Sequence, residues 1–317
     1  MTTQNSVATS AGAPTRRSLE ATSPRYGEKL IKLLLGFAAA FSVLVTTGIV
    51  LSLLFGTIDF VREVPVADFL FGTEWAPSFA DPEFGVLAIV AGTVSIVFWS
   101  LVVAIPVGLS AAIFMAEYAH PRVRKVIKPA LEILEGIPTV AIGLFGLIFL
   151  IPLAQDLLPF LPWSGPFSIG VAGVAVGLLI VPLVASVSDD AMRAVPAGLR
   201  EGAYALGASK FRVSLRVVFP AAISGIVAAF VLAVSRAIGE TMVVLLMAGA
   251  RAQFSFDPTQ SVQTMTAFIG QTATGDIAFG TVDYYTIFAV GALLFVLTLI
   301  MNMLAIRLVR RFREVYE

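Results

Sequence analysis

Long apolar runs alternate with shorter polar connections along most of this chain. A helix needs about 20 apolar residues to cross about 30 Å of hydrocarbon. Six runs meet that length, at 33–58, 85–116, 136–154, 167–188, 219–249 and 284–306. We therefore predict an all-α integral membrane protein with six transmembrane helices. The second run is too long for one straight crossing, and Pro106 within it is expected to break or kink the helix.

The composition supports a membrane protein and argues against several other classes. Of the 317 residues, 58% are hydrophobic and 13% are charged, and the mean hydropathy is +0.92, so a water-soluble domain would lack polar surface. The formal net charge of +0 argues against a nucleic-acid partner. The chain has no cysteine, which excludes disulfides and thiolate chemistry. The single histidine, His120, has no second His or Cys nearby, so we expect a solvated loop residue and no metal site.

Lysine and arginine are concentrated in alternate connections between the runs. Five precede the first run, four follow the second, five lie in 189–218 and four lie in the C-terminal tail. The other three connections hold one, none and one. By the positive-inside rule, both termini are predicted to be cytoplasmic. Trp75 and Trp163 lie in Pro- and Gly-rich connections on the outer side and are expected to anchor at the lipid headgroups.

The N-terminal segment differs from the rest of the chain. Residues 1–28 are rich in Ser, Thr, Ala and Pro and have no apolar periodicity, so we predict a mobile cytoplasmic tail followed by a transmembrane domain over 29–317. The first apolar run begins too late and is too long for a signal-peptide core. It is interpreted as a retained anchor.

The connection at 188–220 reads "SDDAMRAVPAGLREGAYALGASKFRVSLRVVFP" and is too long for a simple link. Leu199, Ala203 and Leu206 recur at helical spacing, Gly207 can take the positive φ that ends a helix, and Ser209 can cap the next one. The pattern predicts a helix, a tight turn and a second helix at the cytoplasmic surface. From the residues alone, an amphipathic element resting on anionic headgroups is one interpretation.

Within this connection, "EGAYALGASKFRVSLRVVFP" resembles the EAA loop of bacterial ABC-importer permeases. The matching positions are Glu201, Ala203, Gly207, Val217 and Pro220. Gly202 replaces the usual second-position Ala, and Phe219 replaces the usual Leu, but the spacing is retained. The resemblance implies that Glu201, Gly202, Ala203, Gly207 and Pro220 belong to coupling helices that seat in a groove of a separate ATPase subunit.

The chain itself lacks the ATP-binding motif that an ATPase motor subunit would need. None of its 26 glycines is followed by Lys, so the phosphate-binding loop G-x-x-x-x-G-K-[ST] is absent. The resemblance therefore implies a pore subunit with no catalytic residues, no metal and no cofactor of its own, with ATP and Mg on the partner ATPase.

Two further segments narrow the resemblance. "EGIPTVAIGLFGL" at 135–147 and "SRAIGETMVVLLMAG" at 235–249 are similar to segments of phosphate-importer permeases, and "SRAIGETM" is closer to the PstC-type subunit than to its PstA-type sister. This resemblance implies alternating-access import of inorganic phosphate across the bacterial plasma membrane. It also implies a heterodimer with a PstA-type permease, two ATPase subunits and an extracytoplasmic phosphate-binding protein. A permease for sulfate or molybdate stays open, as does a proton-coupled carrier that uses Glu240; a membrane enzyme is a more distant alternative.

The fifth run is the only one interrupted by charge. Arg236 and Glu240 stand four residues apart, so on one helix they would share a face and meet. An Arg near the middle of a membrane-spanning helix costs about 2.5–3.5 kcal/mol on insertion scales, so Arg236 should face a partner or a water-filled interior. One interpretation is that the two charges neutralise one another or tie this helix to its neighbour in the assembled dimer. The other is that Arg236 presents its guanidinium to a tetrahedral oxyanion while Glu240 holds the arginine in place and keeps anion binding weak.

Overall fold

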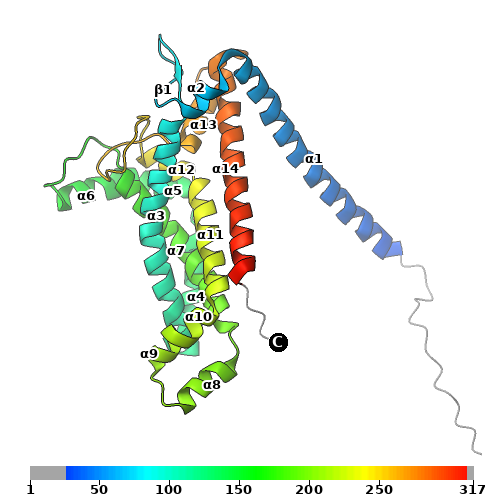
Figure 1. The fold of residues 1–317 in the computed structure, drawn as a ribbon, viewed down its shortest axis with the longest axis vertical. Helices are drawn as coiled ribbons and strands as arrows, with labels where there is room; N and C mark the ends of the chain where they lie inside the picture. Colours follow the sequence, from blue (N-terminus) through cyan, green and yellow to red (C-terminus); the bar gives the residue numbers. More distant parts are fainter. Residues whose placement is uncertain (1–25, 313–317) are drawn as a thin grey trace, which may run out of the picture. The chain divides into compact units, whose positions relative to one another are not determined.

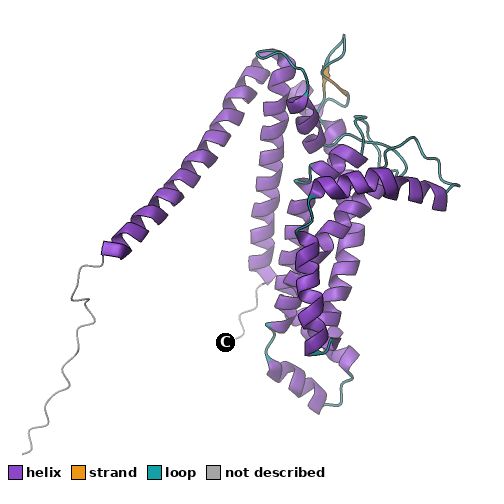
Figure 2. Cartoon of the chain, turned by 180° about the vertical axis from the view of Figure 1, so that it is seen from behind, coloured by secondary structure: helices purple, strands orange, loops and turns teal. Residues whose placement is uncertain are grey.

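The structure is a computed structural model, and it describes residues 26–312. The helices are α1 (Tyr26–Glu63), α2 (Val66–Phe71), α3 (Leu87–Ile113), α4 (Pro121–Glu135), α5 (Thr139–Phe145), α6 (Ile151–Leu157), α7 (Ile169–Arg193), α8 (Ala197–Ala205), α9 (Lys210–Val213), α10 (Phe219–Ala221), α11 (Ile223–Ile238), α12 (Met242–Met247), α13 (Met265–Thr274) and α14 (Val282–Phe312) (Figure 1). Three π-helices continue α3, α5 and α9, and they are η1 (Phe114–Tyr118), η2 (Gly146–Leu150) and η3 (Ser214–Val218). Strands β1 (Trp75–Ala76) and β2 (Glu83–Phe84) pair antiparallel, the one orange element among the purple helices of Figure 2.

The chain divides into two compact units after Ile49, so that α1 contributes to both. The predicted tail at 1–28 falls almost wholly outside the described residues, and its last three residues already belong to α1. The side chains of 28–49 are exposed and mostly apolar, which suits a helix surrounded by lipid.

The prediction of six spans is confirmed, with one change in the fifth. Within residues 26–312, five helical segments are long and apolar enough to cross a membrane, and a bent pair supplies a sixth. The bent pair joins 210–221 to α11 at an angle of 72°. The apolar run 219–249 is therefore not one continuous helix. It divides at Ala222, and α11 then ends at Ile238, with Gly239 as its C-cap.

Helix α7 forms the centre of the second unit and packs against α3 and α11. Small residues permit this close approach. A Cβ atom added at Gly177 would lie 2.6 Å from the carbonyl oxygen of Ser100, and one at Gly173 would overlap Trp99. Pro106 was predicted to break or kink this helix, and no break occurs, because α3 continues through Pro106 to Ile113.

An aromatic cluster closes the end of this unit that carries β1 and β2, which we call the hairpin end. Phe60, Phe69 and Phe84 meet edge to face, and Trp75 packs on Phe268 with ring centroids 4.8 Å apart. Trp75 is only 7% exposed. The prediction that Trp75 anchors in the headgroups is therefore wrong, because β1 turns the indole toward α13.

The second part of the first helix packs against the last helix. The Thr57 hydroxyl lies 3.1 Å from the carbonyl oxygen of Phe288 and also bonds to its own helix at Leu53. Gly56 leaves the space that the Phe288 ring fills, since a Cβ there would overlap that ring. Residues near the start and the end of the chain thus complete one packed surface.

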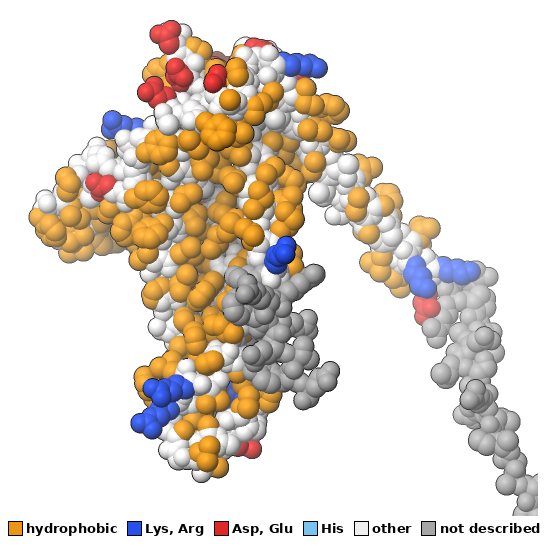
Figure 3. All heavy atoms as spheres, in the orientation of Figure 1, with side chains coloured by type: hydrophobic (Ala, Val, Ile, Leu, Met, Phe, Trp, Pro, Cys, Tyr) orange, Lys and Arg blue, Asp and Glu red, His pale blue; other side chains and the backbone are white. Residues whose placement is uncertain are grey.

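Charge and hydrophobic surface are separated along the second unit. Figure 3 shows hydrophobic side chains over the middle of the bundle, acidic side chains gathered near the hairpin end, and basic side chains near α9 at the opposite end. This opposite end, which we call the α8 end, carries Lys210 and Arg212 on exposed positions.

Candidate functional site

The predicted turn after α8 is confirmed. Gly207 has a φ of +78°, and its N–H donates to the carbonyl of Tyr204 while the N–H of Ala208 donates to that of Ala203. This pair of bonds is the Schellman arrangement that ends a helix at a residue with positive φ. Ser209 takes the predicted N-cap position of α9, but its side chain makes no capping hydrogen bond.

The two sides of α8 differ in exposure. Glu201 and Gly202 are exposed, whereas Ala203 is partly buried against an apolar cluster that includes Met192 and Val213. The helix therefore packs inward through its small residue and leaves the acidic residue free on the surface.

The tip of this element carries large apolar side chains in the open. Leu206, at the turn, is 90% exposed, and Phe211, on α9, is 65% exposed. Large apolar side chains that protrude together beside charged residues are typical of a surface that another protein covers. The tip at 206–211 is thus suited to a protein contact, in addition to any contact with lipid headgroups.

The predicted ion pair between Arg236 and Glu240 is not formed. Helix α11 ends at Ile238, so the two residues do not share a helical face. Glu240 instead caps the next helix. One of its carboxylate oxygens accepts the N–H groups of Thr241 and Val243, each at 3.2 Å. Its carbonyl accepts a 2.7 Å bond from the Thr266 hydroxyl, which joins this break to α13.

Arg236 lies in the last turn of α11 and is half-buried. Within 26–312 its guanidinium forms neither an ion pair nor a hydrogen bond. The end of a helix concentrates carbonyl oxygens, so a cation in the last turn is favoured there by about 0.3–1 kcal/mol. Beside it, Ser235 donates a 2.7 Å bond to Asn302 of α14. The helix break thus occupies the carboxylate of Glu240 and leaves the guanidinium of Arg236 available.

Apart from His120, the polar residues that form these contacts at the α8 end were not singled out from the sequence. Arg124 of α4 forms a 2.7 Å ion pair with Asp189, which is fully buried near the end of α7, and Lys128 forms a 2.6 Å pair with Asp190. His120 is the N-cap of α4, and its Nδ1 accepts the N–H of Arg122. The consecutive Asp residues after an apolar run, opposite a basic segment, were the available signal. Among the described residues, no group of three or more His, Cys, Asp and Glu is placed to hold a metal.

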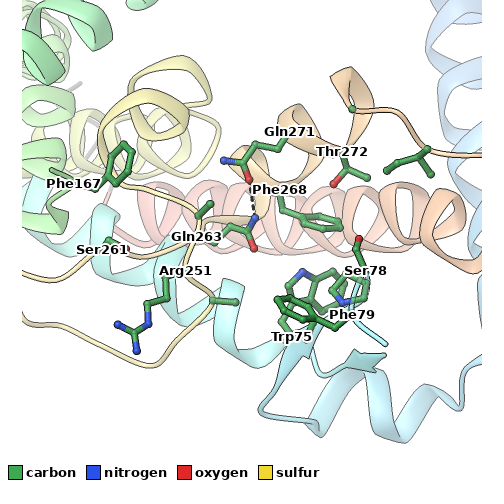
Figure 4. Close-up of a pocket in the computed structure, with 16 residues that line it drawn as sticks. Trp75, Ser78, Phe79, Phe167, Arg251, Ser261, Gln263, Phe268, Gln271 and Thr272 are labelled. Carbon is green, nitrogen blue, oxygen red and sulfur yellow. Dashed lines mark hydrogen bonds between the residues drawn. The ribbon is translucent and has the colours of Figure 1, made fainter. Parts of the chain in front are cut away.

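A groove of about 780 Å³ opens at the hairpin end (Figure 4). Trp75, Phe79 and Phe268 lie on one side of it, and Arg251 lies away from them. The side-chain amides of Gln263 and Gln271 are joined by a 2.8 Å hydrogen bond within the groove. The groove offers an edge-to-face aromatic surface, amide hydrogen-bonding groups and the cation of Arg251 to whatever contacts this end.

The loop beside this groove is fixed by Asp257. Its carboxylate accepts the N–H of Thr259 at 2.9 Å and the hydroxyl of the same residue at 2.7 Å. These hydrogen bonds lower the pKa of Asp257 below its ordinary value. The loop therefore keeps this turn at neutral pH and loses it only as the pH falls through that lowered pKa.

Residues 26–312 thus form a bundle of membrane-spanning helices, with an exposed helix–turn–helix at one end and an unpaired arginine, among the described residues, beside a helix break. The family described as "Binding-protein-dependent transport system inner membrane component" matches residues 104–314, and the chain belongs to this family. It is therefore the membrane component of a transport system whose ATPase is a separate subunit.

Curated relatives match most of the chain. It is 34% identical over 250 residues to "Probable ABC transporter permease protein YqgH" of Bacillus subtilis, covering 79% of this chain and 78% of the relative. It is 31% identical over 301 residues to "Phosphate transport system permease protein PstC" of Xylella fastidiosa strain 9a5c, covering 88% and 91%.

Solved structures share the fold. A bacterial alginate ABC transporter, solved with an alginate pentasaccharide-bound periplasmic protein, aligns with a TM-score of 0.63 at 15% identity, over 93% of this chain and 100% of that one. The inward-facing MetNI methionine ABC transporter aligns with a TM-score of 0.52 at 20% identity, over 73% and 95%. These likenesses establish the arrangement of the helices.

Proposed function

We propose that this chain is the permease subunit of an ATP-driven inorganic phosphate importer and moves phosphate inward by alternating access. The observation that carries the proposal is the 31% identity to a phosphate permease over nearly the whole of both chains. The free guanidinium of Arg236 supports it, because a planar cation with several N–H donors matches the oxygens of a phosphate.

Arg236 and Glu240 take separate roles in this proposal. Arg236 supplies positive charge to the anion path. A charged side chain inside a membrane helix is costly, so it is expected to face a partner or a water-filled path. Glu240 does not hold Arg236 directly. It caps α12 and thereby sets the position of the helix break, at the end of α11 that carries the arginine.

The proposed partners follow from the exposed surfaces and the family. The tip at 206–211, together with Glu201 and Gly202, contacts an ATPase subunit that binds ATP and Mg. The pore is formed by this chain and a PstA-type permease, and two ATPase subunits bind to it. An extracytoplasmic phosphate-binding protein delivers the ion. This chain would hold no cofactor of its own. Membrane lipid would cover the exposed apolar side chains of residues 28–49 and of the middle of the bundle.

Transport assays test the proposed substrate. The full complex, reconstituted in proteoliposomes with ATP on the motor side, should take up radiolabelled phosphate, and excess unlabelled sulfate or molybdate should leave that uptake unchanged. Uptake driven by a proton gradient without ATP would contradict the proposal, as would competition by sulfate at equal concentration.

We propose further that both termini lie in the cytoplasm and that the hairpin end faces outward. The chain has no native cysteine, so a single cysteine can report its own side of the membrane. In intact cells, Ser78→Cys, at an exposed position of the hairpin, should react with an impermeant maleimide, and Ser18→Cys should react only after permeabilisation. Labelling of Ser18→Cys in intact cells would reverse the orientation.

A further inference from the structure

Arg200 of α8 is the most fully engaged cation in this cytoplasmic connection. Its guanidinium donates to a carboxylate oxygen of Glu117 from Nε at 3.2 Å and from Nη2 at 3.1 Å. It also donates at 2.7 Å to the carbonyl of Met192, in the last turn of α7, and at 2.7 Å to that of Val195, just beyond the helix. The side chain of Arg200 is 20% exposed and that of Glu117 is 5% exposed.

These bonds join α8 to the end of α7, which lies just before it in the chain, and to η1, which lies 83 residues away in sequence. Glu117 belongs to η1, the π-helical end of α3, while Met192 lies in the last turn of α7 and Val195 in the link between α7 and α8. Orphan carbonyls at the end of a helix need donors, and a buried carboxylate needs a paired cation. One arginine meets both needs and fixes α8 to α3 and α7 together.

The residue after Glu117 makes a second contact across the turn. The ammonium group of Lys210, on α9, lies 5.0 Å from the centre of the Tyr118 ring. This distance is within the range of a cation–π interaction. Consecutive residues of η1 thus contact α8 and α9, the two helices on either side of Gly207.

The local backbone of η1 permits this double contact. The N–H of Ala119 donates to the carbonyl of Phe114, five residues earlier, as in a π-helix. A π-helix places an additional residue in the turn and so shifts the side chains that follow. Such short π-segments often occur at functional sites.

By contrast, the covalent connection from α9 to α11 is sharply bent. The helical segment 210–221 meets α11 at 72°, with Ala222 between them. A force on α8 can therefore reach the membrane helices by three connections. One passes through Gly207 and this bend to the helix that carries Arg236, and a second is the short covalent link 194–196 to α7. The third passes through Arg200 to η1 at the end of α3 and to the carbonyls at the end of α7.

We propose that Arg200 and η1 form a transmission clamp that passes the movement of the motor from α8 to α3 and α7. Arg200 is a positioning residue in this inference, which rests on the proposed function. When the clamp is intact, α8, the end of α3 and the end of α7 move as one body. Without it, the motor displaces α8 and α9 while the end of α3, which has no short covalent link to α8, lags behind.

The experiment measures how much phosphate is delivered per ATP hydrolysed. In reconstituted complexes, Arg200→Gln should leave assembly and ATP hydrolysis measurable but lower the ratio of phosphate imported to ATP consumed about tenfold. Arg216→Gln removes a cation from an exposed position of the same connection and should keep the wild-type ratio. Glu117→Gln should lower the ratio less, and the double variant should resemble Arg200→Gln, because both changes break one interaction.

An unchanged ratio in Arg200→Gln overturns the clamp, even if both rates fall, because a residue that only stabilises the fold changes the amount of complex and not its coupling. A second readout does not depend on the substrate. Spin labels on cysteines at Tyr204 and Val107, both exposed, should give a broader distance distribution in Arg200→Gln than in the otherwise wild-type chain. Equal distributions also overturn the clamp. Absence of phosphate uptake by the wild-type complex, with broadening still seen, would instead refute the proposed substrate.

Discussion

Arg236→Gln should lower phosphate uptake by about 10- to 150-fold in assembled complexes, which is the effect of losing one charged hydrogen bond of about 1.5–3 kcal/mol. Gln keeps two hydrogen-bonding groups but removes the positive charge that favours an anion inside the membrane. The measurement is uptake of radiolabelled phosphate by proteoliposomes, divided by the amount of complex that copurifies with its ATPase. Arg236→Lys should retain more activity than Arg236→Gln, because it keeps the charge and loses only the forked geometry.

The neighbouring carboxylate separates a transport role from a structural one. Glu240→Gln keeps an oxygen that can accept the N–H groups of Thr241 and Val243, so the cap and the fold should persist. If Arg236 served only to balance that carboxylate, the double variant Arg236→Gln, Glu240→Gln would recover assembly and transport together. We expect the double variant to assemble and to stay inactive. Near-normal uptake by the assembled double variant would refute the anion-path role.

Gly207→Val should abolish coupled transport while the chain still inserts into the membrane. At a φ of +78°, a branched side chain costs about 1–2 kcal/mol and the turn between α8 and α9 would rearrange. The exposed tip at 206–211 would then be displaced. Stimulation of ATP hydrolysis by the phosphate-loaded binding protein and phosphate uptake should both be lost, as measured in reconstituted complexes.

Two matched variants make this result specific to the turn. Gly198→Ala lies on α8, where an added Cβ meets no atom within 4 Å, and should couple normally. Gly207→Asn tolerates positive φ better than any branched residue and should keep partial activity. Wild-type coupling in Gly207→Val would leave the interpretation of a lipid-bound amphipathic surface in place of the motor contact.

The features predicted well from the sequence depend on local chemistry. Gly207 could be placed at a positive φ because a glycine after an Ala-rich helix, followed by Ser209, is a helix end wherever it occurs. The spans at 85–116, 167–188 and 284–306 were found because a continuous apolar run of that length has few other uses. Such signals need no knowledge of neighbouring segments.

The features that the sequence did not reveal depend on where segments meet. The predicted pairing of Arg236 with Glu240 assumed one continuous helix. The segment "IGET" contains no signal that the helix ends before Gly239 or that the carboxylate of Glu240 caps the next helix. The contact between Arg200 and Glu117 crosses 83 residues. The burial of Trp75 depends on Phe268 in the same way. No periodicity within a single run carries this information.

The contact between the first and the last helix sets an order in the biogenesis of this protein. The Thr57 hydroxyl and the Phe288 carbonyl are separated by 231 residues of chain. At a synthesis rate of about 5–20 residues per second, roughly 10–50 s pass before the ribosome supplies the partner of Thr57. During that interval the hydroxyl bonds only to its own helix at Leu53, which satisfies it inside the lipid. The contact of Thr57 and Gly56 with Phe288 can therefore form only after α14 has been synthesised, and until then the Thr57 hydroxyl needs no other partner.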